Sequence, residues 1–470
     1  MMAISTNIFT NIDEFKGRLN CDKNFDIVYR TLTICNRTCA LFFVDGFAKD
    51  GVMSRIITSF YAIKDENQLK DAHTFSKAAV PYGEVAILHD PDAIITAILS
   101  GQSALFVDGF DQAVLIDART YPQRSTSEPD KDKVFRGSRD GFVETLVLNT
   151  ALIRRRIRTP DLCVQHISVG SDSKTDIAIC YIDGRVDTKL LEKVTNKLKE
   201  AKVTALTMNQ ESVSELLIRK KWYNPFPKFK FTERPDTTAA QLLEGDIAIV
   251  VDNSPSVLIV PSTIFHIMEE ANDYYFPPLT GTYLRLTRMV IMILTLLLTP
   301  TWILLTQFPE VLPNWLSFIL ITDEIKVPLL LQLLILEIAI DGMKLASLNT
   351  PNTLTTSLSI IGAIIVGDYA VQSGWFNSQA LLYTAFVTLA NYSQPGFELG
   401  YALKFMRIFL LIMTGAFNIW GYSIGLILIF IMLVANKTMS GRCYLYPLIP
   451  FDWKVLKRHI FRAQLDSENN

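Results

Sequence analysis

Residues Met289–Gln307 read MVIMILTLLLTPTWILLTQ and contain no charged side chain. A helix that crosses a bilayer needs about 20 consecutive apolar residues, so this stretch is long enough to span a membrane. The sequence before it is polar and charged like that of a globular protein, whereas further apolar stretches follow as far as Ala435. We therefore expect a soluble N-terminal half fused to an all-α polytopic membrane domain.

The composition agrees with a chain that has one polar half and one apolar half. Hydrophobic residues make up 49% of the 470 residues, yet 20% are charged. The formal net charge of −2 gives no reason to expect nucleic acid as a partner. Residues Met1–Lys16 lack the apolar core of a signal peptide, so we expect the soluble half to stay in the cytoplasm.

The six cysteines and five histidines are scattered without the spacing of a metal site. We therefore expect reduced thiols, no metal and no cofactor. No nucleophile–base constellation and no phosphate-binding loop motif stands out, so we expect a protein that is not an enzyme.

One pattern recurs in the soluble half. Cys39–Phe47 reads CALFFVDGF and Ala178–Val186 reads AICYIDGRV. Each is an apolar strand that runs into Asp-Gly, and an amphipathic stretch follows, at Met53–Ile63 and Thr188–Ala201. A strand, a tight turn and a helix in this order predict an α/β unit, so we expect two small α/β subdomains.

A related string, ALFVDGF at Ala104–Phe110, is followed by a second strand-like run, Ala113–Asp117. This copy predicts a β-hairpin with its turn at Asp108-Gly109. With these signals we divide the chain into an N-terminal tail (1–23), a first subdomain (24–121), a basic connecting segment with a helix (122–161), a second subdomain (162–262), a juxtamembrane segment (263–288), the transmembrane domain (289–436) and a basic cytoplasmic tail (437–470).

The connecting segment presents arginines in a block. Helical spacing over Glu144–Ile157 places them at one end of a helix. They form either a solvated or membrane-facing basic end, or contacts with acids on a neighbouring subunit, where arginine makes bidentate bonds. The residues that we assign to such a subunit interface are Arg136, Arg139, Asp140, Arg154, Arg155 and Arg156.

The predicted spans of the membrane half are Met289–Gln307, Leu329–Leu345, Thr356–Tyr369 and Gln379–Tyr392, followed by Phe405–Thr414 and Ile419–Ala435 as two shorter spans or one long broken helix. Lysines and arginines gather before the first span and after the last one. By the positive-inside rule both termini are cytoplasmic, which requires an even number of crossings.

Four acids lie at or near membrane depth: Glu337, Asp341, Asp368 and Glu398. Glu337 and Asp341 are four residues apart and share one helix face. Charges in a bilayer are costly, so such residues normally face the bundle interior or a water-filled path. These acids either line a cation pathway or serve structure, by pairing with Lys344, Lys404 or Arg407 or by lying near the interface.

Three long strings resemble one known family. They are RGSRDGFVETLVLNTALIRRRIRTPDL (Arg136–Leu162), the stretch Trp222–Pro261 that begins WYNPFP, and EIAIDGMKLASLNTPNTL (Glu337–Leu354). They are similar to the A subunits of spore germinant receptors, the GerA family, and the similarity extends over essentially the whole chain. The resemblance implies a multi-pass protein of the spore inner membrane that acts in germination. It also implies contact with membrane lipid, assembly as a homo-oligomer, and other germination membrane proteins as partners, either receptor subunits or a small membrane protein.

From the residues and the resemblance together we expect a protein that forms, or contributes to, an oligomeric cation channel. A scaffold that clusters receptors without conducting ions is the first alternative. A secondary transporter is the second, because the sequence breaks a helix near Pro395-Gly396.

Overall fold

The computed structural model of the chain describes residues 4–121, 134–219, 221–321, 326–349 and 370–462. The chain divides into two compact units. Unit 1 comprises Met1–Arg219 and Phe229–Pro261, and unit 2 comprises Lys220–Lys228 and Ser262–Asn470. The predicted span Thr356–Tyr369, with Asp368, lies outside the described residues.

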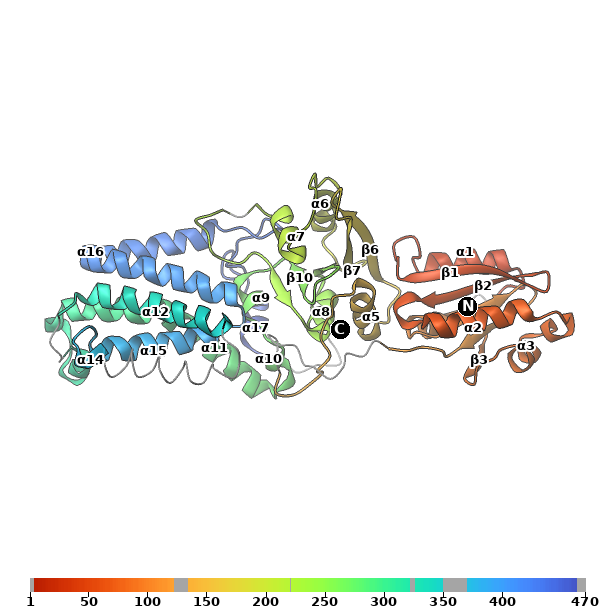
Figure 1. Cartoon of the computed structure of the whole chain (residues 1–470), viewed down its shortest axis with the longest axis horizontal. Coiled ribbons are helices and arrows are strands. Elements are labelled where there is room, and N and C mark those ends of the chain that lie inside the picture. Colours follow the sequence, from red (N-terminus) through yellow and green to blue (C-terminus); the bar gives the residue numbers. More distant parts are fainter. Residues whose placement is uncertain (1–3, 122–133, 220, 322–325, 350–369, 463–470) are drawn as a thin grey trace. The chain divides into compact units, whose positions relative to one another are not determined.

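The described residues of unit 1 form two five-stranded antiparallel sheets (Figure 1). The strands are β1 (Ile27–Ile34), β2 (Arg37–Val44), β3 (Val85–Leu88), β4 (Ser103–Val107) and β5 (Ala113–Ile116), then β6 (Leu162–Val169), β7 (Thr175–Ile182), β8 (Lys230–Thr232), β9 (Ile247–Val251) and β10 (Val257–Val260). The strand orders are β1-β2-β4-β5-β3 and β6-β7-β9-β10-β8. The second order repeats the first, strand for strand.

The helices of unit 1 follow the same repeat. They are α1 (Ile8–Arg18), α2 (Asp50–Ala62), α3 (Ala72–Ala78) and α4 (Pro91–Leu99) in the first half, and α5 (Leu146–Arg156), α6 (Thr188–Lys199), α7 (Asn209–Leu217) and α8 (Pro235–Glu244) in the second. Within the described residues, one α-helix of each half precedes the first strand, two α-helices follow the second strand and one follows the third. The fold of unit 1 is therefore an internal duplication.

The duplication extends to single hydrogen bonds at the start of the first helix of each half. The backbone N–H of Ile8 donates to Asp108 Oδ1 at 3.1 Å, and that of Leu146 donates to Asp252 Oδ1, also at 3.1 Å. Both aspartates lie in the turn after the fourth strand of their half. In each half, therefore, the turn of the last hairpin supplies an acceptor to an N–H that the helix itself leaves without a partner.

A buried asparagine one turn into each helix repeats as well. Asn11 accepts from the N–H of Ser5 and donates to its carbonyl, at 2.9 and 2.6 Å. Asn149 makes the same pair of bonds with Val143, at 2.8 and 2.5 Å. These asparagines fix the chain that enters each helix.

The recurring sequence pattern is confirmed. The two strands that run into Asp-Gly are β2 and β7, and the helices that follow are α2 and α6. The hairpin predicted at Asp108-Gly109 is the pair β4–β5. The N-terminal segment that we set apart as a tail contains α1, which buries Ile8, Ile12 and Phe15 against the first sheet.

Unit 2 is helical. Its helices are α9 (Ile264–Met268), α10 (Ala271–Tyr275), α11 (Pro278–Gln307), α12 (Leu329–Asn349), α14 (Ala370–Gln372), α15 (Ser378–Tyr392), α16 (Phe397–Ala435) and α17 (Trp453–Ile460). Among the described residues, α11 and α16 are the two helices long and apolar enough to cross a membrane. The predicted spans that begin at Met289, Leu329 and Gln379 lie within α11, α12 and α15, respectively.

Helix α16 reverses direction. Asn418 has φ 54° and ψ −135°, which no helical residue adopts. The two parts of α16 on either side of Asn418 run side by side (Figure 1). A Cβ placed on Gly425 would lie 2.7 Å from a methyl carbon of Leu410, so a glycine lets the two parts pack closely. The last apolar stretch is thus a pair of helices rather than one straight span.

Candidate functional site

A cluster of ionisable side chains lies among the apolar helices of unit 2. Helix α12 contributes Glu337 and Asp341, and the first part of α16 contributes Lys404 and Arg407. Arg407 also donates to the carbonyl of Thr295 on α11, at 3.0 Å. Thr295 follows Met289 by six residues, or about 9 Å at a rise of about 1.5 Å per residue. The cluster is therefore well inside the apolar part of the unit.

Glu337 is the centre of this cluster. Its side chain is 6% exposed, and its Oε1 accepts from Arg407 Nε at 2.9 Å and from Arg407 Nη2 at 2.6 Å. Its Oε2 lies 3.2 Å from Lys404 Nζ, which also donates to the Glu337 carbonyl at 3.0 Å. Two cations from α16 thus hold one acid of α12.

Asp341 shares Lys404 with Glu337. Its Oδ2 lies 2.6 Å from Lys404 Nζ, yet its side chain is 33% exposed, against 6% for Glu337. Two acids face two cations, so the formal charge of the four groups is zero. Asp341, one turn along α12 from Glu337, is the more exposed acid of the cluster, although its Oδ1 is buried and accepts no hydrogen bond from the described residues.

Lys344 lies on the next turn of α12 and contacts aromatic rings. Its Nζ is 4.6 Å from the ring centroid of Tyr392 on α15 and 5.4 Å from that of Tyr401 on α16. Aromatic faces attract a cation at this range. Within one chain, Glu337 and Asp341 therefore pair with Lys404 and Arg407, as the structural alternative predicted. Lys344, the third cation of that alternative, contacts aromatic rings instead.

The four acids singled out in the sequence do not all meet. Glu337 and Asp341 do, whereas Glu398 is exposed in the first turn of α16 and Asp368 lies outside the described residues. The assignment of these acids to an ion pathway stays a prediction.

In unit 1 the predicted interface arginines have separate surroundings. Arg154 is fully buried, and its Nε and Nη2 donate to the two carboxylate oxygens of Asp26 at 2.5 and 3.1 Å. Its Nη2 also lies 3.3 Å from Asn24 Oδ1 and from the Leu162 carbonyl. We expected Arg154 to face a neighbouring subunit. Its guanidinium instead joins the two halves of the duplication within one chain and is not accessible to another.

The other members of the block lie nearer the surface. Arg156 donates to Asp140 Oδ2 at 2.6 Å and to Ser138 Oγ at 3.0 Å, which ties α5 to the connecting segment. Arg155 stacks over the ring of Tyr121, 4.6 Å from its centroid. Arg136 and Arg139 are exposed. The assignment to a subunit interface stays a prediction for Arg136, Arg139, Asp140, Arg155 and Arg156.

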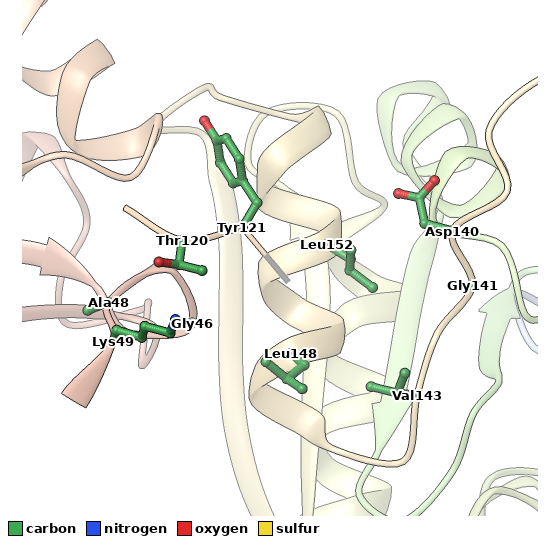
Figure 2. A pocket seen from close by; sticks show the side chains of 10 residues that line it. All are labelled: Gly46, Ala48, Lys49, Thr120, Tyr121, Asp140, Gly141, Val143, Leu148 and Leu152. Carbon is green, nitrogen blue, oxygen red and sulfur yellow. The ribbon is translucent and has the colours of Figure 1, made fainter. Parts of the chain in front are cut away.

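A recess of about 410 Å³ lies where the two halves of unit 1 meet. Figure 2 shows Gly46, Ala48, Lys49, Thr120 and Tyr121 on one side of α5, Leu148 and Leu152 on that helix, and Asp140, Gly141 and Val143 beyond it. Tyr121 donates its hydroxyl to the Ser100 carbonyl at 2.8 Å. Lys49 and Asp140 are the charged residues of the lining, and Asp140 is already bound by Arg156.

A second charged cluster, which we did not predict from the sequence, joins α11 to the segment around α10. Asp273 is fully buried and accepts from Arg288 Nη1 and Nη2 at 2.9 and 3.1 Å, and Glu270 Oε2 accepts from Arg288 Nη2 at 2.8 Å. Nearby, Glu269 Oε1 lies 2.7 Å from His459 Nδ1. Three acids within Glu269–Asp273, just ahead of the arginines that precede an apolar run, were the available signal.

The duplicated α/β fold of unit 1, together with the apolar helices of unit 2 and the charges buried among those helices, defines a membrane protein with an α/β N-terminal region. The chain belongs to the Bacillus/Clostridium GerA spore germination protein family, whose family model matches residues 14–470.

Curated relatives span nearly the whole chain. It is 35% identical to stage V sporulation protein AF of Bacillus subtilis, over 98% of this chain and 94% of that protein. It is 28% identical to spore germination protein KA of the same organism, over 98% and 85% of the two chains. It is also similar to the N-terminal domain of the A subunit of the Bacillus megaterium spore germinant receptor GerK3, in a crystal structure with 25% identity and a TM-score of 0.43 that covers 55% of this chain and 96% of that one.

Proposed function

We propose that this chain acts in spore germination by contributing to a cation path in an oligomeric complex of the spore inner membrane, and that its role is not catalytic. The observation that carries the proposal is the cluster Glu337–Asp341–Lys404–Arg407 within the apolar helices. The Asp341 side chain is 33% exposed in a single chain, and its buried Oδ1 accepts no hydrogen bond from the described residues.

The energetics of such a cluster favour a functional role. Buried ion pairs add little net stability, because removing two charges from water costs about as much as their attraction returns. Apolar side chains would pack α12 against α16 without that cost. Ionisable groups inside membrane helices commonly mark ion pathways. In an oligomer, the partly exposed Asp341 would face a neighbouring chain or a central path.

The cluster also provides a way to close the path. Lys404 is shared between Glu337 and Asp341. In the proposed channel its ammonium group would take the place of a permeant cation. A small rotation of α16 relative to α12 would move Lys404 away from Asp341 and leave Arg407 with Glu337. The path would then expose a carboxylate, which attracts cations.

The test is single-channel recording of the full-length protein in planar bilayers. We expect discrete cation-selective openings from the wild-type protein. In Asp341→Asn the selectivity for cations over anions should fall about tenfold, the ratio that about 1.4 kcal/mol of lost attraction produces. Glu310→Gln is the matched control, because it removes one exposed acid outside the cluster, and it should conduct like the wild type.

Two outcomes would favour the alternatives. An assembled oligomer that is silent in the bilayer, with or without Asp341, would favour the scaffold. The specific observation behind the scaffold is that both acids of the cluster are already paired within one chain. Flux that saturates and requires a counter-substrate would favour the transporter.

A further inference from the structure

Two segments of unit 2 that contact or follow the end of α16 expose aromatic side chains. The loop 221–228 carries Trp222, which is 96% exposed, and Tyr223, which is 52% exposed. The segment 436–462 carries Phe451 and Trp453, which are 67% and 57% exposed, with their rings stacked on one another. Exposed apolar side chains that gather in a patch mark a surface that contacts a protein or a membrane.

The loop 221–228 is held at the end of α16. Asn224 Nδ2 donates to the side-chain carbonyl of Asn436, the C-cap of α16, at 3.1 Å. Lys228 Nζ donates to the Lys437 carbonyl at 2.9 Å, and the ring of Phe226 packs 5.9 Å from that of Tyr444. These contacts keep Trp222 and Tyr223 beside the point where an apolar helix ends.

Basic residues accompany the aromatic ones. Lys454, Lys457 and Arg458 are exposed on α17, whose Leu456 and His459 are buried. Within the described residues, no ion pair engages these three cations. We call the four aromatic and three basic residues the collar.

A contact with α11 places α17 along the membrane helices. Arg285 Nη1 donates to the Arg458 carbonyl at 2.8 Å, and Arg285 lies four residues before the apolar run that begins at Met289. The three cations therefore lie close to the level at which α11 becomes apolar. That level corresponds to the head-group region of a bilayer.

We propose that the collar binds the head groups of anionic phospholipids at the bilayer surface. Tryptophan and tyrosine favour the membrane interface, and lysine or arginine near that surface is attracted to anionic lipid. The apolar surface continues towards the collar, because α16 exposes Ile427, Phe430 and Ile431 in its last turns. Lipid chains that cover those residues bring their head groups to the collar.

When the collar is bound to lipid, the loop 221–228 would act as a membrane anchor. The chain leaves unit 1 after Arg219 and returns to it at Phe229. Pro225 and Pro227 restrict the backbone of the loop, so its shape is stiff. A loop anchored in head groups adds an attachment for unit 1 besides the connection that leads into α11.

The first test measures lipid selectivity of the full-length protein reconstituted in phosphatidylcholine bilayers. Spin-labelled phosphatidylglycerol and spin-labelled phosphatidylcholine report the relative association constant of the anionic lipid. We compare the wild type with the triple variant Lys454→Gln, Lys457→Gln and Arg458→Gln. The matched control removes three exposed lysines in or just after α6 of unit 1, by Lys189→Gln, Lys199→Gln and Lys202→Gln.

We expect the wild type and the control to prefer the anionic lipid by about fivefold or more. The attraction of one lysine or arginine to an anionic membrane surface, about 1 kcal/mol, is enough for a preference of this size. The collar variant should lose that preference. Equal preference in the wild type and the collar variant would overturn the proposal. A collar variant that keeps its lipid preference but loses a protein partner would also overturn the proposal. The collar would then be a surface that binds protein.

The second test follows Trp222 itself and does not depend on the charged variant. The difference in fluorescence between the wild type and Trp222→Phe isolates this residue. Lipids brominated high on their acyl chains should quench it, and aqueous iodide should quench it several-fold less than free tryptophan. Quenching by iodide as efficient as that of free tryptophan would place Trp222 in water and reject the anchoring role.

Discussion

At the scale of single residues, the pair Arg154–Asp26 joins the two halves of unit 1. Arg154 comes from α5 in the second half, and Asp26 directly precedes β1 in the first. Both side chains are almost completely buried. A buried ion pair adds little stability by itself, but removal of one partner leaves an uncompensated charge, which costs about 3–5 kcal/mol.

We therefore expect Arg154→Met to lower the local free energy of unfolding by about 3–5 kcal/mol. Hydrogen exchange of the β1 and β6 amides in the full-length protein measures this loss. Arg136→Gln changes an exposed arginine of the same block and should stay within about 0.5 kcal/mol of the wild type. Unchanged protection of β1 and β6 in Arg154→Met would show that the pair does not hold the halves together.

Two lysines with opposite surroundings provide a pH-dependent prediction. Partial burial and, second, the positive charge of Lys221 lower the pKa of Lys228 from 10.5 to about 8. A hydrogen bond to Asp183 raises the pKa of Lys23 above 10.5. Competitive acetylation as a function of pH, read by mass spectrometry, should give a midpoint near 8 for Lys228 and above 10.5 for Lys23.

The sign of the effect on stability follows from proton binding. Between pH 8 and 10.5 the unfolded chain keeps a proton on Lys228 that the folded chain has lost. Lys228 therefore makes the free energy of unfolding rise with pH between pH 8 and 10.5. Below pH 8 both states bind the proton, and Lys228 lowers the free energy of unfolding by a constant amount. Identical acetylation midpoints for Lys228 and Lys23 would contradict at least one of the two pKa shifts.

At the scale of elements, the duplication offers a comparison of two caps. Asp108 caps α1 together with Asn7, whose side chain accepts from Phe9 N–H. Asp252 caps α5, where the N-cap residue Thr145 makes no side-chain cap bond. Loss of a helix cap costs about 0.5–2 kcal/mol, and less when a second acceptor remains.

We therefore expect Asp252→Ala to weaken the first turn of α5 by about 1–2 kcal/mol, and Asp108→Ala to weaken that of α1 by less. Amide exchange in the two first turns provides the comparison within one molecule. A larger loss at α1 than at α5 would mean that Asn7 does not share the capping role.

At the scale of the whole molecule, the reversal of α16 bears on topology. The two parts of α16 return the chain to the side from which it entered, if both cross the bilayer. The loop 221–228, which continues into unit 1 at both ends, is bound to Asn436 and Lys437 just after α16. The two termini should thus lie on one side of the membrane.

We expect fusions at the N-terminus and at the C-terminus to report the cytoplasm in both cases. Green fluorescent protein fused at either end should fluoresce, and alkaline phosphatase fused at either end should be inactive. The positive-inside rule predicts the cytoplasm for both. A C-terminal alkaline phosphatase that is active would mean an odd number of crossings. The inference that both termini lie on one side of the membrane would then be wrong.

What the sequence determines by itself is local. Hydrophobic period and length identify the apolar helices, and the apolar runs that end in Asp-Gly identify β2 and β7. Glu337 and Asp341 fall on one face of a helix because a helix repeats every 3.6 residues. The family is likewise readable from continuous strings such as RGSRDGF.

Only the tertiary structure decides which charges meet. Arg154 pairs with Asp26 across 128 residues, and Arg407 pairs with Glu337 across 70. No spacing rule connects positions so far apart, because the geometry depends on how strands and helices pack. The arginine block looked like one surface in the sequence, yet packing buries Arg154 and leaves Arg136 exposed. Burial is a property of the packed unit, so the physical role of each charge follows from the fold.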